Sequence, residues 1–256
     1  MMAHLLLIDA LNLIRRIYAV DCEQSGLTDE QIIKSSTQRV KNATRKLLKA
    51  SQASHAIAVF DGDRSWRYHL YPQYKATRKP MPSELKTSLE TVATGFTEHN
   101  VKAYFPLQDE ADDILATLAF KAASHGVSST IVSTDKGFLP LISEHISVYD
   151  YFKQQTINAD DVQKKFSIDK NKLHDFWGLM GDKTNDIPGV KGVGKKTAID
   201  VLSEFGSVEN ALESQNLNAT ARKKIESDID NFILSKSLVA LRTDIEVGFT
   251  LKELRL

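Results

Sequence analysis

The chain has 256 residues and a mass of 28.6 kDa, with 33 basic and 33 acidic residues and therefore no formal net charge. This length allows one large domain or a domain with a smaller appendage, and the balanced charge means that affinity for a polyanion must come from local clusters. A single cysteine, Cys22, excludes an internal disulfide framework and fits a reducing compartment.

Neither metal-binding histidines nor membrane segments are indicated. The seven histidines lack the close spacing of a zinc site. The apolar run before Asp9 is too short for a secretory signal, and no run reaches the roughly twenty residues that cross a bilayer. We expect a cytoplasmic protein without a membrane partner, with a monomer as the default state.

Strand-like apolar runs recur through the first 150 residues, with amphipathic stretches between most of them. This alternation predicts an α/β fold with a mostly parallel sheet and helices on both faces. Several runs end at an aspartate, at the sheet edge where ligands bind in open α/β folds. A single aspartate there would need no function, since it also favours turns and helix caps. The runs are 3–9, 55–61, 101–105, 128–135 and 145–150, and the aspartates are Asp9, Asp61, Asp135 and Asp150.

The segment from Asp61 to Pro82 interleaves basic and aromatic side chains and contains three prolines, so we expect a mobile loop or short helices. Its composition is typical of a channel for single-stranded nucleic acid, where phosphates meet cations and bases stack on rings. A solvated loop whose rings pack on the body explains it equally well. The residues concerned are Arg64, Arg67, Lys75, Arg78, Lys79, Trp66, Tyr68, Tyr71 and Tyr74.

Four acids, Asp109, Glu110, Asp112 and Asp113, open the stretch 108–122, which continues as an amphipathic helix. Helix N-termini favour one or two acids, whereas four carboxylates repel one another unless a cation intervenes. Convergence with the strand-end aspartates would form an all-oxygen site suited to Mg²⁺ or Mn²⁺, ions that activate water and stabilise charge on a phosphodiester. Unrelated solvated acids are the alternative. The proposed cluster is Asp9, Asp61, Glu110, Asp112, Asp113, Asp135 and Asp182.

After residue 158 the strand signal fades, and helices are predicted over 159–166, 171–180, 195–205 and 222–242. The predicted organisation is an α/β body of residues 1–158 followed by a helical part of residues 159–256.

Residues 181–198, GDKTNDIPGVKGVGKKTA, combine glycines, lysines and acids. Residues 189–196 nearly match a P-loop, but Lys196 replaces the serine or threonine and no strand precedes the motif, which disfavours a nucleotide-triphosphate site. A tight turn into a helix N-terminus would instead hold phosphates of one strand without reading sequence. A helix connection with exposed lysines is the alternative. The residues of this turn are Gly192, Val193, Gly194, Lys195, Lys196 and Thr197.

In chain order, the motifs LLLIDALNLIRR, VFDGDRSWR, YKATRKPMP, EADDILATLA, IVSTDKG and GDKTNDIPGVKGVGKKTA resemble those of the 5′ nuclease superfamily. That family includes flap endonucleases, phage 5′ nucleases and the 5′ nuclease domain of bacterial DNA polymerase I. The resemblance covers nearly the whole chain, which looks like a short stand-alone bacterial flap endonuclease because it has no polymerase segment.

The resemblance implies a PIN-like α/β body, a helical arch at about 62–82 and a helix-three-turn-helix module at about 178–205. Members cut 5′ flaps and other branched DNA near the junction of single strand and duplex, in replication or repair, and 5′-3′ exonuclease activity can accompany this. Preferred DNA geometry and recruitment by a sliding clamp or polymerase are left open.

The resemblance also assigns roles to individual residues. Lys75 and Arg78 match arch residues that engage the scissile phosphate and the flap, and the turn module is implied to hold K⁺ that bridges to a duplex phosphate. The implied first-metal ligands are Asp9, Asp61, Glu110, Asp112 and Asp113; the implied K⁺ ligands are the carbonyls of Leu179, Met180, Pro188, Val190 and Val193; the implied DNA contacts are Arg64, Arg67, Tyr74, Lys75, Arg78 and Gly192 to Thr197.

Two departures from the family pattern weaken the implied second metal site. Gly137 stands where a second aspartate is common, and Asn185 then Asp186 stand where aspartate then asparagine are common. An amide lacks the charge that favours Mg²⁺, and Asp186 could compensate only if the turn redirects it. We therefore expect one strong metal site, and a second weak one to which Asp135 and Asp182 contribute.

The favoured function is a metal-dependent flap endonuclease. The depleted second site motivates the alternative of a structure-specific DNA-binding protein with weak or vestigial catalysis. A small-molecule phosphatase would leave the arch and the turn module unexplained.

Overall fold

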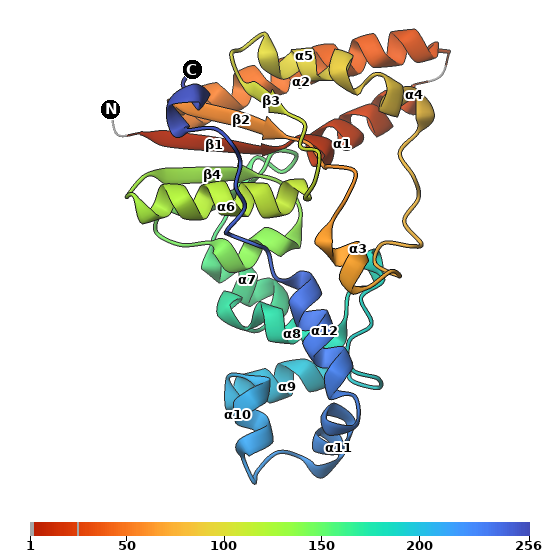
Figure 1. Cartoon of the computed structure of the whole chain (residues 1–256), viewed down its shortest axis with the longest axis vertical. Helices are drawn as coiled ribbons and strands as arrows, with labels where there is room; N and C mark the ends of the chain where they lie inside the picture. Colours follow the sequence, from red (N-terminus) through yellow and green to blue (C-terminus); the bar gives the residue numbers. More distant parts are fainter. Residues whose placement is uncertain (1–2, 25) are drawn as a thin grey trace. The chain divides into compact units, whose positions relative to one another are not determined.

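The structure is a computed structural model that describes residues 3–24 and 26–256. It divides into two compact units (Figure 1). The first contains Met1–Ser65, Pro80–Thr156 and Arg242–Leu256, and the second contains Trp66–Lys79 and Ile157–Leu241. Within the described ranges, none of the helices combines the length and apolarity needed to cross a membrane.

A six-stranded sheet forms the centre of the first unit, with the strand order β3-β2-β1-β4-β5-β6. β1 pairs in parallel with β2 and β4, and the pairs β2–β3 and β4–β5 are also parallel. The parallel sheet predicted from the sequence is therefore confirmed. The strands are β1 (His4–Asp9), β2 (His55–Val59), β3 (Lys102–Tyr104), β4 (Ser128–Val132), β5 (Ile146–Asp150) and β6 (Gln155–Ile157).

The strand order reverses at β1, because β2 and β4 flank it on opposite sides. Such a switch point leaves a crevice at the carboxyl ends of the strands, since the flanking connections leave in opposite directions. Asp9 ends β1, Asp61 follows β2 and Asp135 follows β4. The three aspartates therefore lie along this edge.

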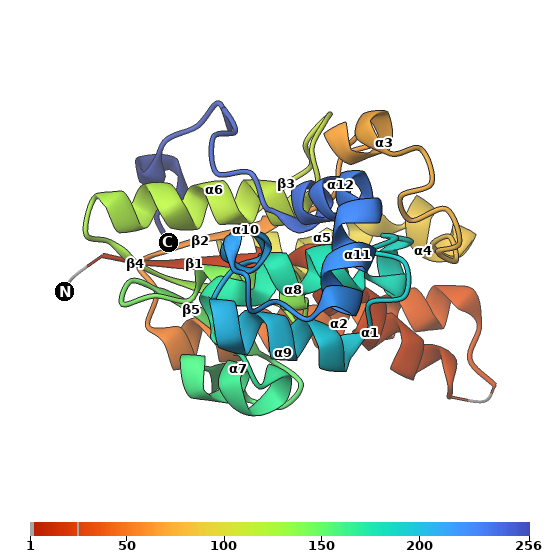
Figure 2. The same ribbon diagram turned by 90° about the horizontal axis from the view of Figure 1, so that it is seen from below.

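Helices cover both faces of the sheet. On one face, Leu6, Ile8, Ala56 and Ala58 join a buried cluster with apolar residues of α1, α2 and α5. α6 packs on β1 and β4 and lies on the opposite side of the sheet from α1 and α2 (Figure 2). The helices of this unit are α1 (Ala10–Cys22), α2 (Asp29–Ser51), α4 (Ser83–Thr87), α5 (Leu89–Thr97) and α6 (Ala111–Ser124), with 3-10 helices η1 (Lys136–Leu141) and η4 (Leu251–Leu254).

The final segment, residues 242–256, groups with the first compact unit, whereas the predicted division at residue 158 placed it in the helical part. The backbone N–H of Ile245 donates to Thr117 Oγ1 on α6 at 3.3 Å, and the N–H of Leu256 donates to the carbonyl of Ser54 at 3.1 Å. These are backbone contacts, which side-chain patterns do not report.

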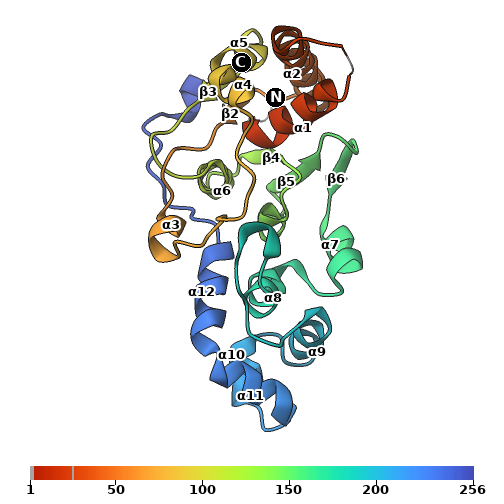
Figure 3. The same cartoon turned by 90° about the vertical axis from the view of Figure 1, so that its right-hand side faces the viewer.

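The second unit is helical, with α8 packed against α9 and α12. The predicted helices over 159–166, 171–180 and 195–205 are confirmed. Residues 66–79, predicted as part of an arch on the body, group with this unit instead; Figure 3 shows α3, which opens this segment. The elements are α3 (Trp66–Leu70), α7 (Ala159–Phe166), η2 (Lys170–Lys172), α8 (Leu173–Met180), η3 (Lys183–Asn185), α9 (Lys195–Phe205), α10 (Val208–Glu213), α11 (Ala219–Ser227) and α12 (Ile229–Val239).

The stretch 222–242, predicted as helical, is divided at Asp228 into the end of α11 and the whole of α12. Asp228 accepts hydrogen bonds from the N–H of Lys191 at 2.6 Å and from Asn231 Nδ2 at 2.8 Å. The break therefore ties α12 to the turn before α9.

Candidate active site

The strand-end aspartates are all held by backbone donors. Asp9 Oδ1 accepts from the N–H of Asn12 at 3.1 Å, and Asp135 Oδ1 accepts from the N–H of Gly137 at 2.7 Å. Asp61 Oδ1 accepts from the N–H of Ala111 at 2.9 Å, across fifty residues of sequence. The capping role considered from the sequence is thus real, and it fixes these carboxylates at the sheet edge.

Asp9 lies at the centre of this negative charge. Its side chain is buried, and its pKa is raised to about 7 in total, mainly by burial, then by the negative charge of Asp61 and, more weakly, by that of Asp135. Hydrogen bonds from Ser133 Oγ, at 2.8 Å, and from Asn12 act in the opposite direction. Burial is the main cause of the raised pKa, and the neighbouring carboxylates of Asp61 and Asp135 add to it.

The bond from Ala111 to Asp61 brings the first turn of α6 to the same edge. Glu110 is the N-cap residue of α6, is buried, and accepts from Ser65 Oγ at 3.2 Å. Asp112 follows in the first turn and is half-buried. The helix N-terminus predicted at this acidic motif is confirmed, and its Glu110 and Asp112 adjoin the residue that Asp61 caps.

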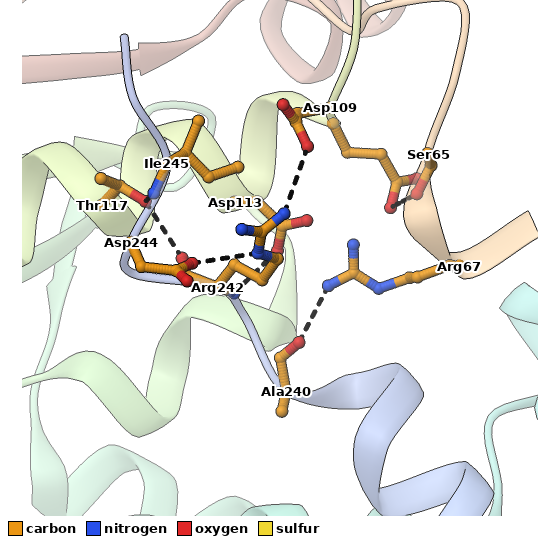
Figure 4. A network of polar contacts seen from close by, with 10 residues as sticks. Ser65, Arg67, Asp109, Asp113, Thr117, Ala240, Arg242, Asp244 and Ile245 are labelled. Carbon is orange, nitrogen blue, oxygen red and sulfur yellow. Dashed lines mark hydrogen bonds and ion pairs between the residues drawn. The ribbon is translucent and has the colours of Figure 1, made fainter. Parts of the chain in front are cut away.

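Asp113 faces a different environment, shown in Figure 4. It is fully buried, and its Oδ1 accepts from the backbone N–H of Arg242 at 3.0 Å. Arg242 also pairs with Asp109 at 3.8 Å and with Asp244 at 3.0 Å. This position gives Asp113 a structural role in holding the final segment, and does not support its prediction as a direct metal ligand.

Within residues 3–24 and 26–256, no three carboxylate, histidine or cysteine side chains are gathered closely enough to hold a metal ion as they stand. The seven predicted acids are therefore not seen as one group in the described residues, and Asp113 bonds to the backbone of Arg242. The donor set at the edge, carboxylate oxygens around an acid with a raised pKa, still fits a hard divalent cation in charge and donor type.

The second-unit acids have defined partners of their own. Asp182 is buried and accepts from the N–H of Thr184 at 3.1 Å and from Asn185 Nδ2 at 2.9 Å. Both carboxylate oxygens of Asp186 accept from Thr77, at 2.8 to 2.9 Å. The turn therefore directs Asp186 to Thr77, and the compensation considered from the sequence is not seen.

Arg67 and Tyr74, predicted to contact DNA, are buried in the second unit. Arg67 is 2% exposed and donates from Nε to the carbonyl of Leu238 at 2.8 Å. Its Nη2 donates to the carbonyl of Ala240 at 2.9 Å, the bond drawn in Figure 4. Tyr74 packs against Ile187 and Leu238. Both predictions are corrected, because these side chains hold the segment 66–79 to α12 and are not exposed to a strand.

Arg67→Ala is expected to lower the free energy of unfolding by about 2–4 kcal/mol, because it leaves a cavity and buried carbonyls without their donor. Urea unfolding followed by circular dichroism measures this loss. The matched control is Arg64→Ala, which removes an exposed arginine of the same sequence segment. Equal stability of the two variants would contradict the structural role of Arg67.

The remaining predicted arch cations are accessible. Arg64 and Arg78 are exposed, and Lys75 is half-buried with its Nζ 4.9 Å from the centre of the Tyr74 ring. Lys75 also has a left-handed backbone, with φ of 55°.

The turn module is built on a close crossing of two backbone segments. Gly181 and Gly189 both have positive φ, of 72° and 66°. A Cβ on Gly181 would lie 2.7 Å from the carbonyl oxygen of Pro188, and one on Gly189 would lie 2.6 Å from the carbonyl carbon of Met180. Only glycine permits this approach, which brings the carbonyl-bearing segments 179–181 and 187–190 together.

Backbone hydrogen bonds connect the crossing to the turn that precedes α9. The N–H of Val190 donates to the carbonyl of Leu179 at 2.8 Å, and that of Val193 to the carbonyl of Val190 at 3.0 Å. Gly194 is the N-cap of α9 and, having no side chain, supplies no side-chain cap.

Lys195 and Lys196 are exposed in the first turn of α9. The N-terminus of α9 therefore presents backbone N–H groups beside two lysines, a combination suited to an anion. The side chain of Val193 is buried, so only its backbone is available there.

Three residues of these sites were not singled out from the sequence. Ser133 and Asn12 hold Asp9, and Lys224 Nζ donates to the carbonyl of Gly192 at 2.9 Å. A serine two residues before Asp135, in the IVSTDKG motif, was the available signal for Ser133. No local sequence pattern indicates the role of Lys224, because it lies 32 residues after Gly192.

Comparison with known proteins gives the same architecture. The 5′-3′ exonuclease N-terminal resolvase-like domain matches residues 4–167, and the 5′-3′ exonuclease C-terminal SAM fold matches residues 168–256. This boundary lies nine residues beyond the predicted change at 158.

Curated relatives match along the whole chain. A protein called flap endonuclease Xni from Pseudoalteromonas translucida is 54% identical over 256 residues, with 100% of both chains covered. One of the same name from Colwellia psychrerythraea is 43% identical, covering 100% of this chain and 93% of the relative.

Solved structures share the fold at low sequence identity. T5 5′-exonuclease with bound zinc has a TM-score of 0.76 at 20% identity, covering 92% of this chain and 89% of that chain. The catalytic core of Rad2 in complex with DNA substrate has a TM-score of 0.59 at 16% identity, covering 97% and 81%.

A resolvase-like α/β domain followed by a helical SAM-like fold, with carboxylates at the switch point of the sheet, defines the architecture of the 5′ nucleases. The chain matches both domain models in order and along almost its full length. It belongs to the 5′-3′ exonuclease family and is a nuclease, a hydrolase of phosphodiester bonds. The fold, family and enzyme class predicted from the sequence are confirmed.

Proposed function

We propose that this protein is a divalent-metal-dependent flap endonuclease that cuts 5′ flaps of branched DNA near the junction of single strand and duplex. A 5′-3′ exonuclease activity would use the same site, and the setting would be DNA replication or repair in the cytoplasm, with the protein acting as a monomer. The observation that carries the proposal is the edge of carboxylates around the buried Asp9. The relatives' shared name supports the substrate.

Asp9, Asp61, Glu110 and Asp112 would hold Mg²⁺ or Mn²⁺, with Asp135 and Asp182 contributing to a weaker second site. The chemistry that such ions supply when bound is activation of water and stabilisation of charge on the phosphodiester. Asn12 and Ser133 hold the Asp9 carboxylate in place. Lys75 and Arg78 would bind the scissile phosphate and the flap, and would stabilise the negative charge that develops during cleavage.

We expect the second metal site to bind Mg²⁺ more weakly than the first. Gly137 provides no carboxylate, and Asn185 Nδ2 donates a hydrogen bond to Asp182 Oδ2. Calorimetry with Mg²⁺ on the free protein is expected to show one strong binding event. Two tight events would contradict the hypothesis.

The turn module would hold the duplex by its phosphates. The N–H groups at the start of α9, with Lys195, Lys196 and Thr197, would contact consecutive phosphates of one strand. K⁺ would be held by backbone carbonyls at the glycine crossing and would bridge to a phosphate. Its expected ligands are the carbonyls of Leu179, Met180, Pro188, Val190 and Val193.

The double variant Lys195→Ala/Lys196→Ala is expected to reduce the salt dependence of duplex binding. Each lost phosphate contact lowers the slope of log K against log salt by about 0.9, so the slope should fall by about 2. Fluorescence anisotropy across a salt series measures it. Lys164→Ala/Lys165→Ala on α7 is the control, since both lysines are exposed in the same unit; an equal change there would refute a local role for α9.

The test of the proposed function is cleavage of a 5′-labelled flap duplex in Mg²⁺, with and without chelator. We expect one defined product near the junction, which the chelator abolishes. A blunt duplex and a 3′ flap serve as comparison substrates. Tight binding of the flap without cutting would favour the branched-DNA-binding alternative instead.

A further inference from the structure

Hydrogen bonds within the protein connect the segment that carries Lys75 and Arg78 to the turn module. The backbone N–H of Thr77 donates to Asp186 Oδ2 at 2.8 Å, and its hydroxyl donates to Oδ1 of the same carboxylate at 2.8 Å. Beside them, the N–H of Lys75 donates to the carbonyl of Asn185 at 3.0 Å. Together these bonds form what we call the clasp.

The clasp includes two residues in an unusual backbone conformation. Lys75 and Asp186 both have φ of 55°, in the left-handed region that residues with a Cβ rarely adopt. Such conformations persist where surrounding contacts over-determine them. The clasp supplies such contacts, because Asp186 accepts two hydrogen bonds from Thr77 and the N–H of Lys75 donates to the carbonyl of Asn185.

Thr77 of the clasp is exposed and the other clasp residues are half-buried, whereas the anchors before it in the chain are buried. Tyr74 packs against Ile187, and Arg67 bonds to the carbonyls of Leu238 and Ala240. Thr77 and Arg78 are exposed beyond these anchors. The clasp therefore adds contacts that hold residues 75–78 beyond the buried anchors.

We propose that Thr77 and Asp186 are positioning residues that order Lys75 and Arg78 before DNA binds. The inference rests on the proposed function for the roles of Lys75 and Arg78, but the order of the segment is independent of it. Asp186 is thereby used to hold the segment and not as a metal ligand. Its charge matters because hydrogen bonds to a carboxylate are stronger than those to a neutral amide.

Limited trypsin digestion of the free protein, in chelator and without DNA, tests the clasp directly. Thr77→Val keeps the branched side chain but removes the hydroxyl donor. Cleavage after Lys75 and Arg78 is expected to accelerate by about tenfold, because local opening becomes easier. Thr77→Ser should restore protection. Thr220→Val, at an exposed threonine of the same unit, is the matched control.

A double-mutant cycle assigns the effect to the pair. Asp186→Asn keeps a residue that tolerates the left-handed backbone but removes the charge. We expect it to accelerate cleavage as Thr77→Val does, with little further increase in the double variant, because both remove the same interaction. Full additivity would overturn the pairing, and wild-type protection in Thr77→Val would overturn the clasp.

The consequence for the nuclease is measured by single-turnover cleavage at saturating flap DNA. Thr77→Val is expected to cut about tenfold more slowly with duplex affinity unchanged, and Thr77→Ser to recover. An unchanged rate in Thr77→Val, with Lys75→Ala/Arg78→Ala strongly impaired, would overturn the positioning role. Normal cutting by Lys75→Ala/Arg78→Ala would refute the proposed role of the arch, while the proteolysis result would still decide the clasp.

Discussion

Asp112→Ala is expected to slow cleavage of a 5′ flap by at least about a hundredfold, with flap binding changed by no more than about twofold. The half-buried carboxylate of Asp112 lies in the first turn of α6, next to Ala111, which Asp61 caps. Losing it would remove one charged ligand from the site, and single electrostatic contacts of this kind are worth about a hundredfold or more in rate. Single-turnover kinetics with a labelled flap, and anisotropy in Ca²⁺, measure the two quantities.

The chain offers a closely matched control for this variant. Ala159, Asp160 and Asp161 open α7 with the same three residue types as Ala111, Asp112 and Asp113 open α6. Asp160→Ala therefore makes the same change at the same helix position, on a helix of the second unit. If both variants cut DNA at the wild-type rate, or both lose activity equally, the assignment of Asp112 is wrong.

The second large effect concerns stability. Asp9→Asn is expected to raise the free energy of unfolding at pH 8, in chelator, by a few kcal/mol, with an upper bound of about 4 kcal/mol. Burial and neighbouring negative charge raise the pKa of Asp9 from 3.8 to about 7 in the folded protein. Ionised Asp9 therefore opposes folding above that pH, and the asparagine does not ionise.

The direction of the pH dependence follows from the raised pKa. The stabilising effect of Asp9 is fully present below about pH 4 and is lost as the pH rises through 7, so wild type should lose stability relative to Asp9→Asn across that window. Urea unfolding at a series of pH values measures the difference. Mg²⁺ at pH 8 should restabilise wild type and leave Asp9→Asn nearly unchanged.

Asp150→Asn is the control for the stability experiment, because Asp150 is also a buried aspartate at a strand end. It caps a turn through bonds from Phe152 and Lys153, which an asparagine can largely preserve. A similar gain in Asp150→Asn would mean that the effect is not specific to the acidic edge.

The parts of the fold that depend on local periodicity could be predicted from the sequence. Apolar runs such as 3–9 and 128–135 indicate strands, and the apolar spacing from Ile114 onward indicates a helix, because side chains repeat with the period of each element. The acids before Ile114 indicate where that helix starts, because helix N-termini favour negative charge. Asp9 and Asp61 could be placed at one edge since parallel strands share their carboxyl ends.

What could not be predicted depends on contacts between distant parts of the chain. Arg67 and Arg78 are both arginines in one basic stretch, yet Arg67 is buried because α12, over 160 residues later, presents carbonyls to it. Asp113 is likewise drawn to Arg242. Nor does spacing show that Asp186 faces Thr77 and not a metal, because its direction is set by a single left-handed residue.

The contacts of residues 242–256 with α6 also bear on how the chain can be divided into parts. Asp113 and Thr117 are buried polar residues of the first unit, and the backbone N–H groups of Arg242 and Ile245 donate to them from 129 and 128 residues further along the chain. The residues between α6 and this segment include the second unit's stretch Ile157–Leu241. A single cut in the chain between the two units would therefore remove donors that the first unit uses, so the first unit needs both ends of the sequence around the second unit.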